Sequence, residues 1–345
     1  MPPKQVDVSG EESQGLLSRH PDDDLETASK HDAHDRNSEA AGDKARRSGL
    51  LAALLYGSTS ITITFFNKAV FFVWHFDYPV SISLLQVIMS LLLFAGLHLH
   101  GTVALPTISL RMMTTAAPLA IFWCLNVLSG IFTLQYMSIP MFSTLRRLTT
   151  LIVLIGEHVL LRKYATRPVW IAVLVMTLGA LVAGFSDLDF NPIGYMCVTI
   201  NNLCTAAYLL LIQVTKRDLQ VSNLQLLFLM NLCSLPFLLV LFLFFDAQLV
   251  WEYPHLHNLY FMAVLFSSCV QAFVLNYATF LCTTLNSGVT TSITGQMSKL
   301  VTMTVGLFIF VNHTYSNMTL VGLFVGLISS FWYAYIKFAE GRSGG

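Results

Sequence analysis

Residues 139–163 read IPMFSTLRRLTTLIVLIGEHVLLRK, an apolar run interrupted by two adjacent arginines and one glutamate. A helix crosses a bilayer with about 20 residues, so the run is long enough to span a membrane. An ionisable side chain at the centre of such a helix costs at least ~2.5–3.5 kcal/mol, so it needs a cavity, a partner or a route to the interface. The stretch therefore predicts a membrane helix whose charged residues have a function.

The whole chain has the composition of a membrane protein. Of its 345 residues, 55% are hydrophobic and 11% are charged, whereas a soluble domain carries about 25% charged residues. Apolar spans recur along the chain and predict about ten membrane helices in an all-α polytopic fold, arranged as a 5+5 inverted repeat. The expected spans are 49–72, 79–98, 114–135, 141–161, 168–186, 192–213, 223–245, 258–281, 288–311 and 317–337.

The ends of the chain differ from this membrane domain, which covers residues 49–337. Residues 1–48 hold 7 of the 19 basic and 11 of the 19 acidic residues and almost no aromatic or β-branched ones, which predicts a disordered cytosolic tail. Residues 338–345 form a second, short cytosolic tail. The N-terminal tail lacks an apolar signal-peptide core, so we expect no cleavable signal. It contains Glu12, Leu16 and Leu17, a pattern similar to an acidic dileucine sorting signal that also arises by chance.

The loops between the predicted helices alternate in charge. If the tail is cytosolic, the cytosolic segments hold Arg46, Arg47, Arg111, Arg162, Lys163, Arg167, Lys216, Arg217, Lys337 and Arg342. The opposite loops hold His75, Asp77, Asp187, Asp189, Asp246, Glu252 and His313, and no Lys or Arg. This alternation follows the positive-inside rule and predicts that both termini are cytosolic. The sequons at Asn312 and Asn317 then lie in the last lumenal loop, too close to the membrane for us to expect glycosylation.

Five ionisable residues lie inside the predicted spans: Lys68, Arg146, Arg147, Glu157 and Lys299. One acid cannot neutralise four cations, which predicts a water-filled, positively lined cavity for an anion such as a diphosphate. Lys299 lies near the middle of its helix, so we expect it to bind this anion rather than to form a structural ion pair with Glu157. Adjacent residues differ by about 100° around a helix, so one of Arg146 and Arg147 lines the cavity while the other pairs or snorkels.

The two remaining charges have competing interpretations. Glu157 is expected to be the counter-ion of a cation on another helix, or a coupling residue. Lys68 either binds phosphate or snorkels to the nearby interface. The six cysteines have no metal-ligand spacing, so neither a metal site nor a cofactor is expected. Membrane enzymes usually show paired acids or a His cluster, and none is evident here, so the sequence does not indicate an enzyme.

Four segments resemble one family of membrane transporters. They are Asn67-Lys68-Ala69 at the end of the first span, the stretch 139–163 quoted above, GALVAGFSDLDFNPIGY at 179–195, and CVQAFVLNYATFLCTTLNSGVTTSITGQMSK at 269–299. On these segments the chain resembles the eukaryotic nucleotide-sugar transporters of the drug/metabolite transporter superfamily. It is most similar to the branch that carries UDP-glucuronate and UDP-N-acetylgalactosamine.

The resemblance implies an antiporter that exchanges a cytosolic nucleotide sugar for a lumenal nucleoside monophosphate. The implied location is the Golgi membrane, with the endoplasmic reticulum as the alternative, and the chain would act alone or as a homodimer without a nucleic-acid partner. Two rival cargoes stay open: a GDP-sugar such as GDP-mannose or GDP-fucose, and a phosphorylated metabolite of the triose-phosphate type.

Two motifs bear on which base is carried. GDP-sugar carriers have a Phe-Tyr-x-Asp-Asn-like element that recognises guanine, and of positions 227–231 only Asn231 matches it, which favours a UDP-sugar. Their Gly-Ala-Leu-Asn-Lys motif is represented by Gly295 through Lys299, whereas UDP-sugar relatives tend to have lysine one residue earlier, at Ser298. Phosphate is therefore assigned to Lys299, Arg146, Arg147 and Lys68, and the base or sugar to Asn231, Gln296, Asn276, Tyr277 and Ser298.

Uncharged polar residues inside the spans allow a structural interpretation as well. Amides in membrane helices commonly hydrogen-bond a neighbouring helix. We expect this role for most members of the set Asn67, Gln86, Asn126, Asn201, Asn202, Asn231, Gln271, Asn276 and Gln296. Tyr136, Tyr208 and Tyr277 could stack on a nucleobase, although tyrosines in such helices more often only pack.

Overall fold

The computed structural model describes most of the membrane domain. The described residues are 44, 46–67, 70, 73–76, 78–106, 108–137, 139–185, 191–256, 258–309, 324–326, 328–336 and 339. The tail up to residue 43, Lys68 and both sequons lie outside them. What the sequence predicts for those residues stays a prediction.

The described part of the chain is helical and contains no strand. After a first helix, Arg46–Asn67, the elements are α2 (Pro79–Leu99), α3 (Leu110–Tyr136), α4 (Ile139–Leu145), α5 (Leu148–Leu160), α6 (Arg167–Phe185), α7 (Pro192–Leu219), α8 (Asn223–Phe245), α9 (Ala247–Trp251), α10 (Leu259–Leu285) and α11 (Gly288–Ile309). A last apolar helix spans Phe324–Ile336. Within the described residues, six helices are long and apolar enough to cross a membrane: Arg46–Asn67, Pro79–Leu99, Leu110–Gly130, Pro192–Leu219, Asn223–Phe245 and Leu259–Leu285.

Side-chain caps explain where two of the predicted helices begin. At the start of α8, Ser222 and Gln225 form a capping box, in which each side chain accepts a hydrogen bond from the other residue's backbone N–H. At the start of α7, Asn191 accepts from the N–H groups of Ile193 and Gly194. Pro192 comes first in that helix, where its missing N–H is not needed. The predicted starts at residues 192 and 223 are confirmed.

The predicted helix 141–161 is wrong as a continuous element, because it is broken at Arg146 and Arg147 into α4 and α5. The N–H of Arg147 bonds to the carbonyl of Thr144, and the N–H of Thr150 bonds to that of Arg147, three residues back instead of four. Such a tight turn inside a helix often marks a hinge or a functional position. The two arginines therefore lie at a junction between helices, where the carbonyl of Arg146 can also accept from Gln296 of α11.

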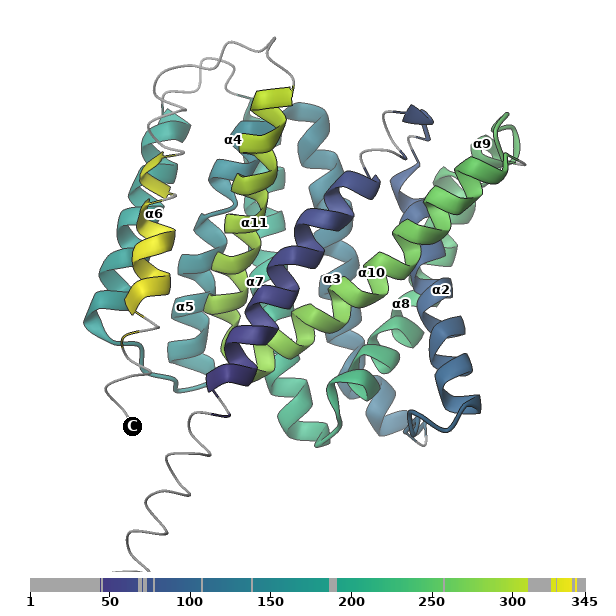
Figure 1. Cartoon of the computed structure of the whole chain (residues 1–345), viewed down its shortest axis with the longest axis horizontal. Helices are drawn as coiled ribbons and strands as arrows, with labels where there is room; N and C mark the ends of the chain where they lie inside the picture. Colours follow the sequence, from purple (N-terminus) through teal and green to yellow (C-terminus); the bar gives the residue numbers. More distant parts are fainter. Residues whose placement is uncertain are drawn as a thin grey trace, which may run out of the picture.

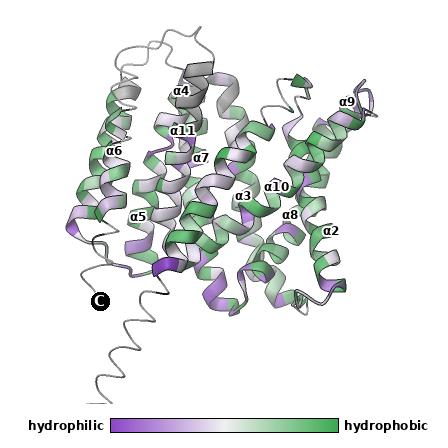
Figure 2. Ribbon diagram, in the orientation of Figure 1, coloured by the Kyte–Doolittle hydropathy of each residue, from purple (hydrophilic) through white to green (hydrophobic). Residues whose placement is uncertain are grey.

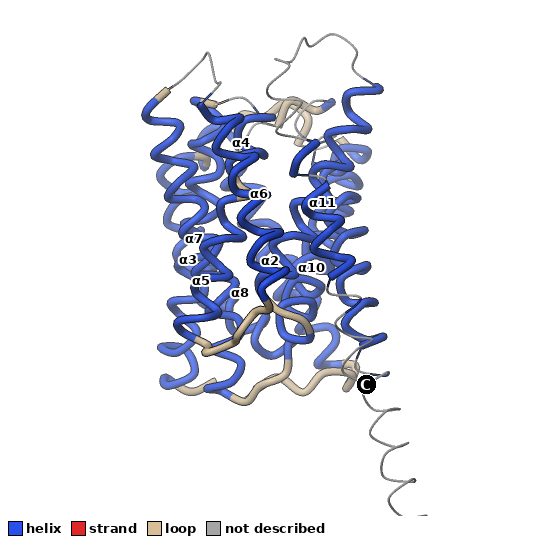
Figure 3. The backbone as a smooth tube through the Cα atoms, turned by 90° about the vertical axis from the view of Figure 1, so that its left-hand side faces the viewer, coloured by secondary structure: helices blue, strands red, loops and turns tan. Residues whose placement is uncertain are grey.

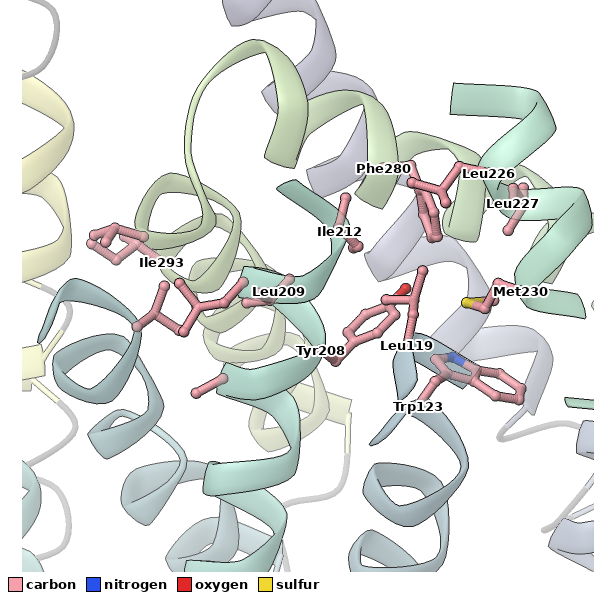
Figure 4. Close-up of a cluster of buried hydrophobic side chains, with 14 of the residues drawn as sticks. Leu119, Trp123, Tyr208, Leu209, Ile212, Leu226, Leu227, Met230, Phe280 and Ile293 are labelled. Carbon is pink, nitrogen blue, oxygen red and sulfur yellow. The ribbon is translucent and has the colours of Figure 1, made fainter. Parts of the chain in front are cut away.

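The helices run side by side in one bundle (Figure 1 and, from the side, Figure 3). Helix α3 packs along α7, α2 packs along α8, and α11 packs against α5. Buried apolar side chains from several of these helices meet in the centre. Figure 4 shows part of this core, including Leu119 and Trp123 of α3, Tyr208 of α7 and Phe280 of α10.

The helices of the bundle are rich in hydrophobic residues, which Figure 2 colours green. Large apolar side chains on several helices are widely exposed, with relative exposures of 60% for Leu92, 59% for Leu178, 82% for Phe244 and 55% for Phe266. A water-soluble monomer rarely shows apolar surface on this scale. The chain is a membrane protein with several spans, and this surface faces lipid.

One end of the bundle, which we call the basic face, carries the arginines and lysines at the helix ends: Arg46, Arg47, Arg111, Arg162, Lys163, Arg167, Lys216 and Arg217. Hydrogen bonds connect distant segments there. Gln225 Nε2 donates to the carbonyl of Ala104 (3.0 Å), and Asn286 Nδ2 donates to that of Gly49 (2.9 Å). At the opposite end, Asp246 Oδ2 accepts from the N–H (2.9 Å) and hydroxyl (2.6 Å) of Ser81 in the first turn of α2.

Candidate functional site

A cavity of about 220 Å³ lies in the middle of the bundle. Its walls come from the first helix, α3, the α4–α5 junction, α7, α10 and α11. These elements come from both halves of the chain, so the cavity exists only when the two halves are packed together.

Two cations line the cavity, Arg146 and Lys299. The guanidinium of Arg146 donates to Thr205 Oγ1 (3.3 Å) and lies 5.5 Å from the ring centroid of Phe142. Lys299 makes no hydrogen bond or ion pair with any described residue, and the two charges repel each other. No described Asp or Glu lines the cavity. The arrangement is therefore suited to an anion that would neutralise both groups.

The two adjacent arginines have different surroundings: Arg146 lines the cavity and Arg147 does not. Arg147 is 1% exposed and does not line the cavity. Its guanidinium packs against Gly326 on the last helix, so closely that a Cβ added at Gly326 would lie 1.9 Å from Nη1. Arg147 thus joins the α4–α5 junction to the last helix, and the phosphate-binding role predicted for it is not supported by its position.

The uncharged wall of the cavity includes Gln296 and Asn276, both predicted from the sequence. Gln296 Nε2 donates to Thr150 Oγ1 (2.7 Å) and to the carbonyl of Arg146 (3.3 Å). Because a carbonyl can only accept, the nitrogen must face Arg146. Gln296 Oε1 is left buried without a partner among the described residues.

Tyr208 also lines the cavity, and its hydroxyl is likewise buried with no described partner. An unmade hydrogen bond of a buried group costs about 1–3 kcal/mol. Among the uncharged atoms that line the cavity, the Tyr208 hydroxyl and Gln296 Oε1 would therefore gain most from a bound ligand. The amide of Asn276 makes no hydrogen bond with the described residues either.

Three residues predicted to contact the base or sugar do not line the cavity. Asn231 is fully buried in α8, and neither polar atom of its amide has a partner among the described residues. Tyr277 packs against the apolar core. The hydroxyl of Ser298 bonds to the carbonyl of Gly57 on the first helix (3.1 Å). For each of these three residues, the sequence predicted the helix but not the side of that helix on which the side chain lies.

Glu157 also lies away from the cavity. It accepts hydrogen bonds from the backbone N–H of Gly288 and from the side chain of Gln213. It forms no ion pair with a described cation, so the predicted pairing with a cation on another helix is not found there. Most other amides follow the structural interpretation, as when Asn201 Nδ2 bonds to Asn126 Oδ1 (3.1 Å).

The lining residues that were not singled out from the sequence include Tyr56, Trp123, Thr149 and Thr205. Hydroxyl and aromatic residues are common in membrane helices and often serve only packing, so their types carry little signal. Thr205 is the hydrogen-bond partner of Arg146, but this contact depends on how α7 is rotated against the α4–α5 junction, which the sequence does not show.

Comparisons with known proteins agree with this architecture. The model of the Triose-phosphate Transporter family matches residues 47–334. A UDP-N-acetylglucosamine transporter of Arabidopsis thaliana is 31% identical, over 86% of this chain and 90% of its own length. A UDP-galactose/UDP-glucose transporter of the same plant is 30% identical, over 85% of this chain and 91% of its own. A GDP-mannose transporter of that species is 27% identical, over 86% and 91%.

A protein of known crystal structure shares the fold, with a TM-score of 0.60 at 12% identity over 85% of this chain and 97% of its own. The named relatives are transporters, so the expectation that the chain is a transporter and not an enzyme is confirmed. The expected branch is neither supported nor opposed by these matches. With nearly the whole membrane domain covered, the chain belongs to the Triose-phosphate Transporter family, as one of its nucleotide-sugar transporters.

Proposed function

We propose that the protein is an antiporter that carries a UDP-sugar from the cytosol into the Golgi lumen in exchange for a nucleoside monophosphate. The observation that carries the proposal is the pair Arg146 and Lys299, which line one cavity with no described carboxylate beside them. A nucleotide sugar brings a diphosphate, whose oxygens match guanidinium and ammonium donors. The relatives named for UDP-sugars support this class of cargo.

The lining residues suggest how the cargo is divided between two parts of the cavity. Arg146 and Lys299 bind the phosphates. Gln296 Oε1, the Tyr208 hydroxyl and the Asn276 amide bind hydroxyl or N–H groups of the base or sugar, since these atoms lack partners among the described residues. Lys68, at the predicted lumenal end of the first helix, is proposed to attract the phosphate of the nucleoside monophosphate at the lumenal entrance.

Transport follows from alternating access by two halves of about five helices each, rocking around this site. The cavity of about 220 Å³ is smaller than the ~300–1,000 Å³ of typical ligand pockets. It must therefore widen when the cargo enters. Exchange follows because an empty cavity holding two like charges reorients slowly, whereas an anion neutralises them and speeds the change.

The proposed orientation places the basic face in the cytosol, in agreement with the positive-inside rule. Ten helices with both termini cytosolic complete this topology. A homodimer is compatible with this topology.

Reconstituted liposomes test the function. The purified chain is inserted into vesicles preloaded with UMP, and labelled UDP-sugars, GDP-sugars and triose phosphate are offered outside. We expect UDP-sugar uptake that falls to background when the preload is omitted. Uptake of GDP-sugars alone would overturn the choice of base, and uptake of triose phosphate alone would favour a phosphorylated-metabolite translocator. If none of the three enters, the antiporter proposal fails.

A further inference from the structure

Three helices that line the cavity are joined by one carboxylate close to the basic face. Glu157 of α5 is 5% exposed. Its Oε1 accepts a hydrogen bond from the N–H of Gly288, the first residue of α11 (2.6 Å), and another from Gln213 Nε2 of α7 (2.8 Å). A carboxylate at a helix N-terminus is further stabilised by the helix dipole.

This contact lies between the cavity and the basic face. On α5, α7 and α11, the lining residues nearest that face are Thr149, Leu209 and Thr291. Glu157, Gln213 and Gly288 follow them by 8, 4 and 3 residues in the direction of the basic face. At 1.5 Å per helical residue these separations are roughly 12, 6 and 5 Å. We call Glu157, Gln213 and Gly288 the closing layer. A cargo that moves between the cavity and the basic face must pass it.

The layer is closely packed. A Cβ added at Gly156 would lie 2.3 Å from Leu210 Cδ1, so α5 and α7 are in tight contact there. A Cβ added at Gly288 would lie 3.0 Å from Val153 Cγ1. The hydrogen bond from Asn286 to the carbonyl of Gly49 ties the first helix to the other helices at this end of the cavity. On this side, the helices around the cavity are held together.

The chemistry of the contact suits a closure that opens repeatedly. A carboxylate accepting from N–H groups forms bonds about twice as strong as neutral ones. Glu157 makes no ion pair with a described cation that would have to be broken as well. Its two donors belong to two different helices, so one movement of α5 away from α11 and α7 releases both bonds.

We propose that Glu157 is a gate residue, whose bonds to Gly288 and Gln213 close the route between the cavity and the basic face and are released in each transport cycle. The inference rests on the proposed function for its role in transport. The closure itself is independent of which cargo is carried.

Thiol labelling tests the gate directly. Thr279 lines the cavity, and among the described residues its hydroxyl bonds only to the carbonyl of Leu275 in its own helix, which makes Thr279→Cys a conservative reporter. Sealed vesicles with the basic face outside are treated with a membrane-impermeant maleimide, and the chain with only its own six cysteines gives the background. We expect Glu157→Gln to raise the labelling rate about threefold or more, because the amide oxygen still accepts but the charge is lost. Glu157→Ala should raise it further.

The matched control is Asp246→Asn. Asp246 also holds a helix start through its carboxylate, but at the opposite end of the bundle, so labelling from the basic face should stay at the parent rate. Unchanged labelling in Glu157→Gln, or an equal rise in both variants, would overturn the gate. Glu157→Gln keeps both hydrogen bonds, so the test survives if Glu157→Ala fails to fold.

Labelling needs no substrate, so the gate and the function can fail separately. If liposome uptake fails while labelling rises, the antiporter proposal falls and the gate stands. If uptake succeeds while labelling is unchanged, Glu157 is only a static cap of α11.

Discussion

Lys299 is the residue with most to gain from a bound anion, since it makes no bond with a described residue and Arg146 repels it. Replacing Lys299 with Gln removes one charged hydrogen bond to phosphate, worth about 1.5–3 kcal/mol. We expect the KM for the UDP-sugar to rise roughly tenfold or more. Uptake measured in the liposomes over a range of concentrations checks this.

The matched control for that loss of charge is Lys216→Gln, in the last turn of α7 and outside the cavity. Its KM should stay within about twofold of the parent value, because this half-buried charge does not contact the cavity. Equal effects of the two substitutions would mean that Lys299 acts through net charge and not by contacting cargo.

Also at the scale of single residues, the uncharged polar atoms of the cavity that lack described partners should determine which base or sugar is preferred. Tyr208→Phe removes a hydroxyl that has no described partner and keeps the ring in the core. The folded protein should lose no stability, while competition between different UDP-sugars or bases should change by about 1 kcal/mol or more, roughly fivefold. Tyr277→Phe, outside the cavity, is the control. Loss of stability without a change in competition would contradict this role.

At the scale of elements, the last helix is held by Gly326, which lies against the buried guanidinium of Arg147. Gly326→Ala would place a methyl group 1.9 Å from Nη1. Overpacking costs about 1–3 kcal/mol, and disturbing a buried charge adds to it, so the melting temperature in detergent should fall clearly. Gly96→Ala in α2 is the control, because its added Cβ meets nothing within 4 Å and alanine favours a helix by up to ~1 kcal/mol. A stable Gly326→Ala variant would show that Arg147 is free to move.

At the scale of elements, most helices could be predicted because hydropathy and caps act locally. The spans predicted to start at residues 192 and 223 do start there, where the structure shows the caps Asn191 and Ser222. The α4–α5 junction could not be predicted, because neither Gly nor Pro, the usual helix breakers, stands at Arg146 and Arg147. The break depends on contacts with other helices, such as the bond from Gln296 to the carbonyl of Arg146. Charge likewise marked Arg146 and Lys299 for the site, whereas the directions of Asn231 and Ser298 depend on how whole helices are rotated.

For the whole molecule, the proposed topology makes both chain ends accessible from the cytosol. Epitope tags at the N- and C-termini should bind antibody after selective permeabilisation of the plasma membrane. A tag placed between Asn312 and Asn317 should bind only after the lumenal compartment is opened as well. Termini found on opposite sides would require an odd number of crossings and would refute the topology of ten helices.

The bond between Ser81 and Asp246 joins residues that are 165 positions apart. At ribosomal rates of about 5–20 residues per second, roughly 8–33 s pass between the synthesis of the two. During that interval the backbone N–H and the hydroxyl of Ser81 cannot yet form their bonds to the Asp246 carboxylate. A nascent chain stopped before residue 246 therefore cannot complete this end of the bundle, and the N-terminal half should remain a client of membrane chaperones until the C-terminal half arrives.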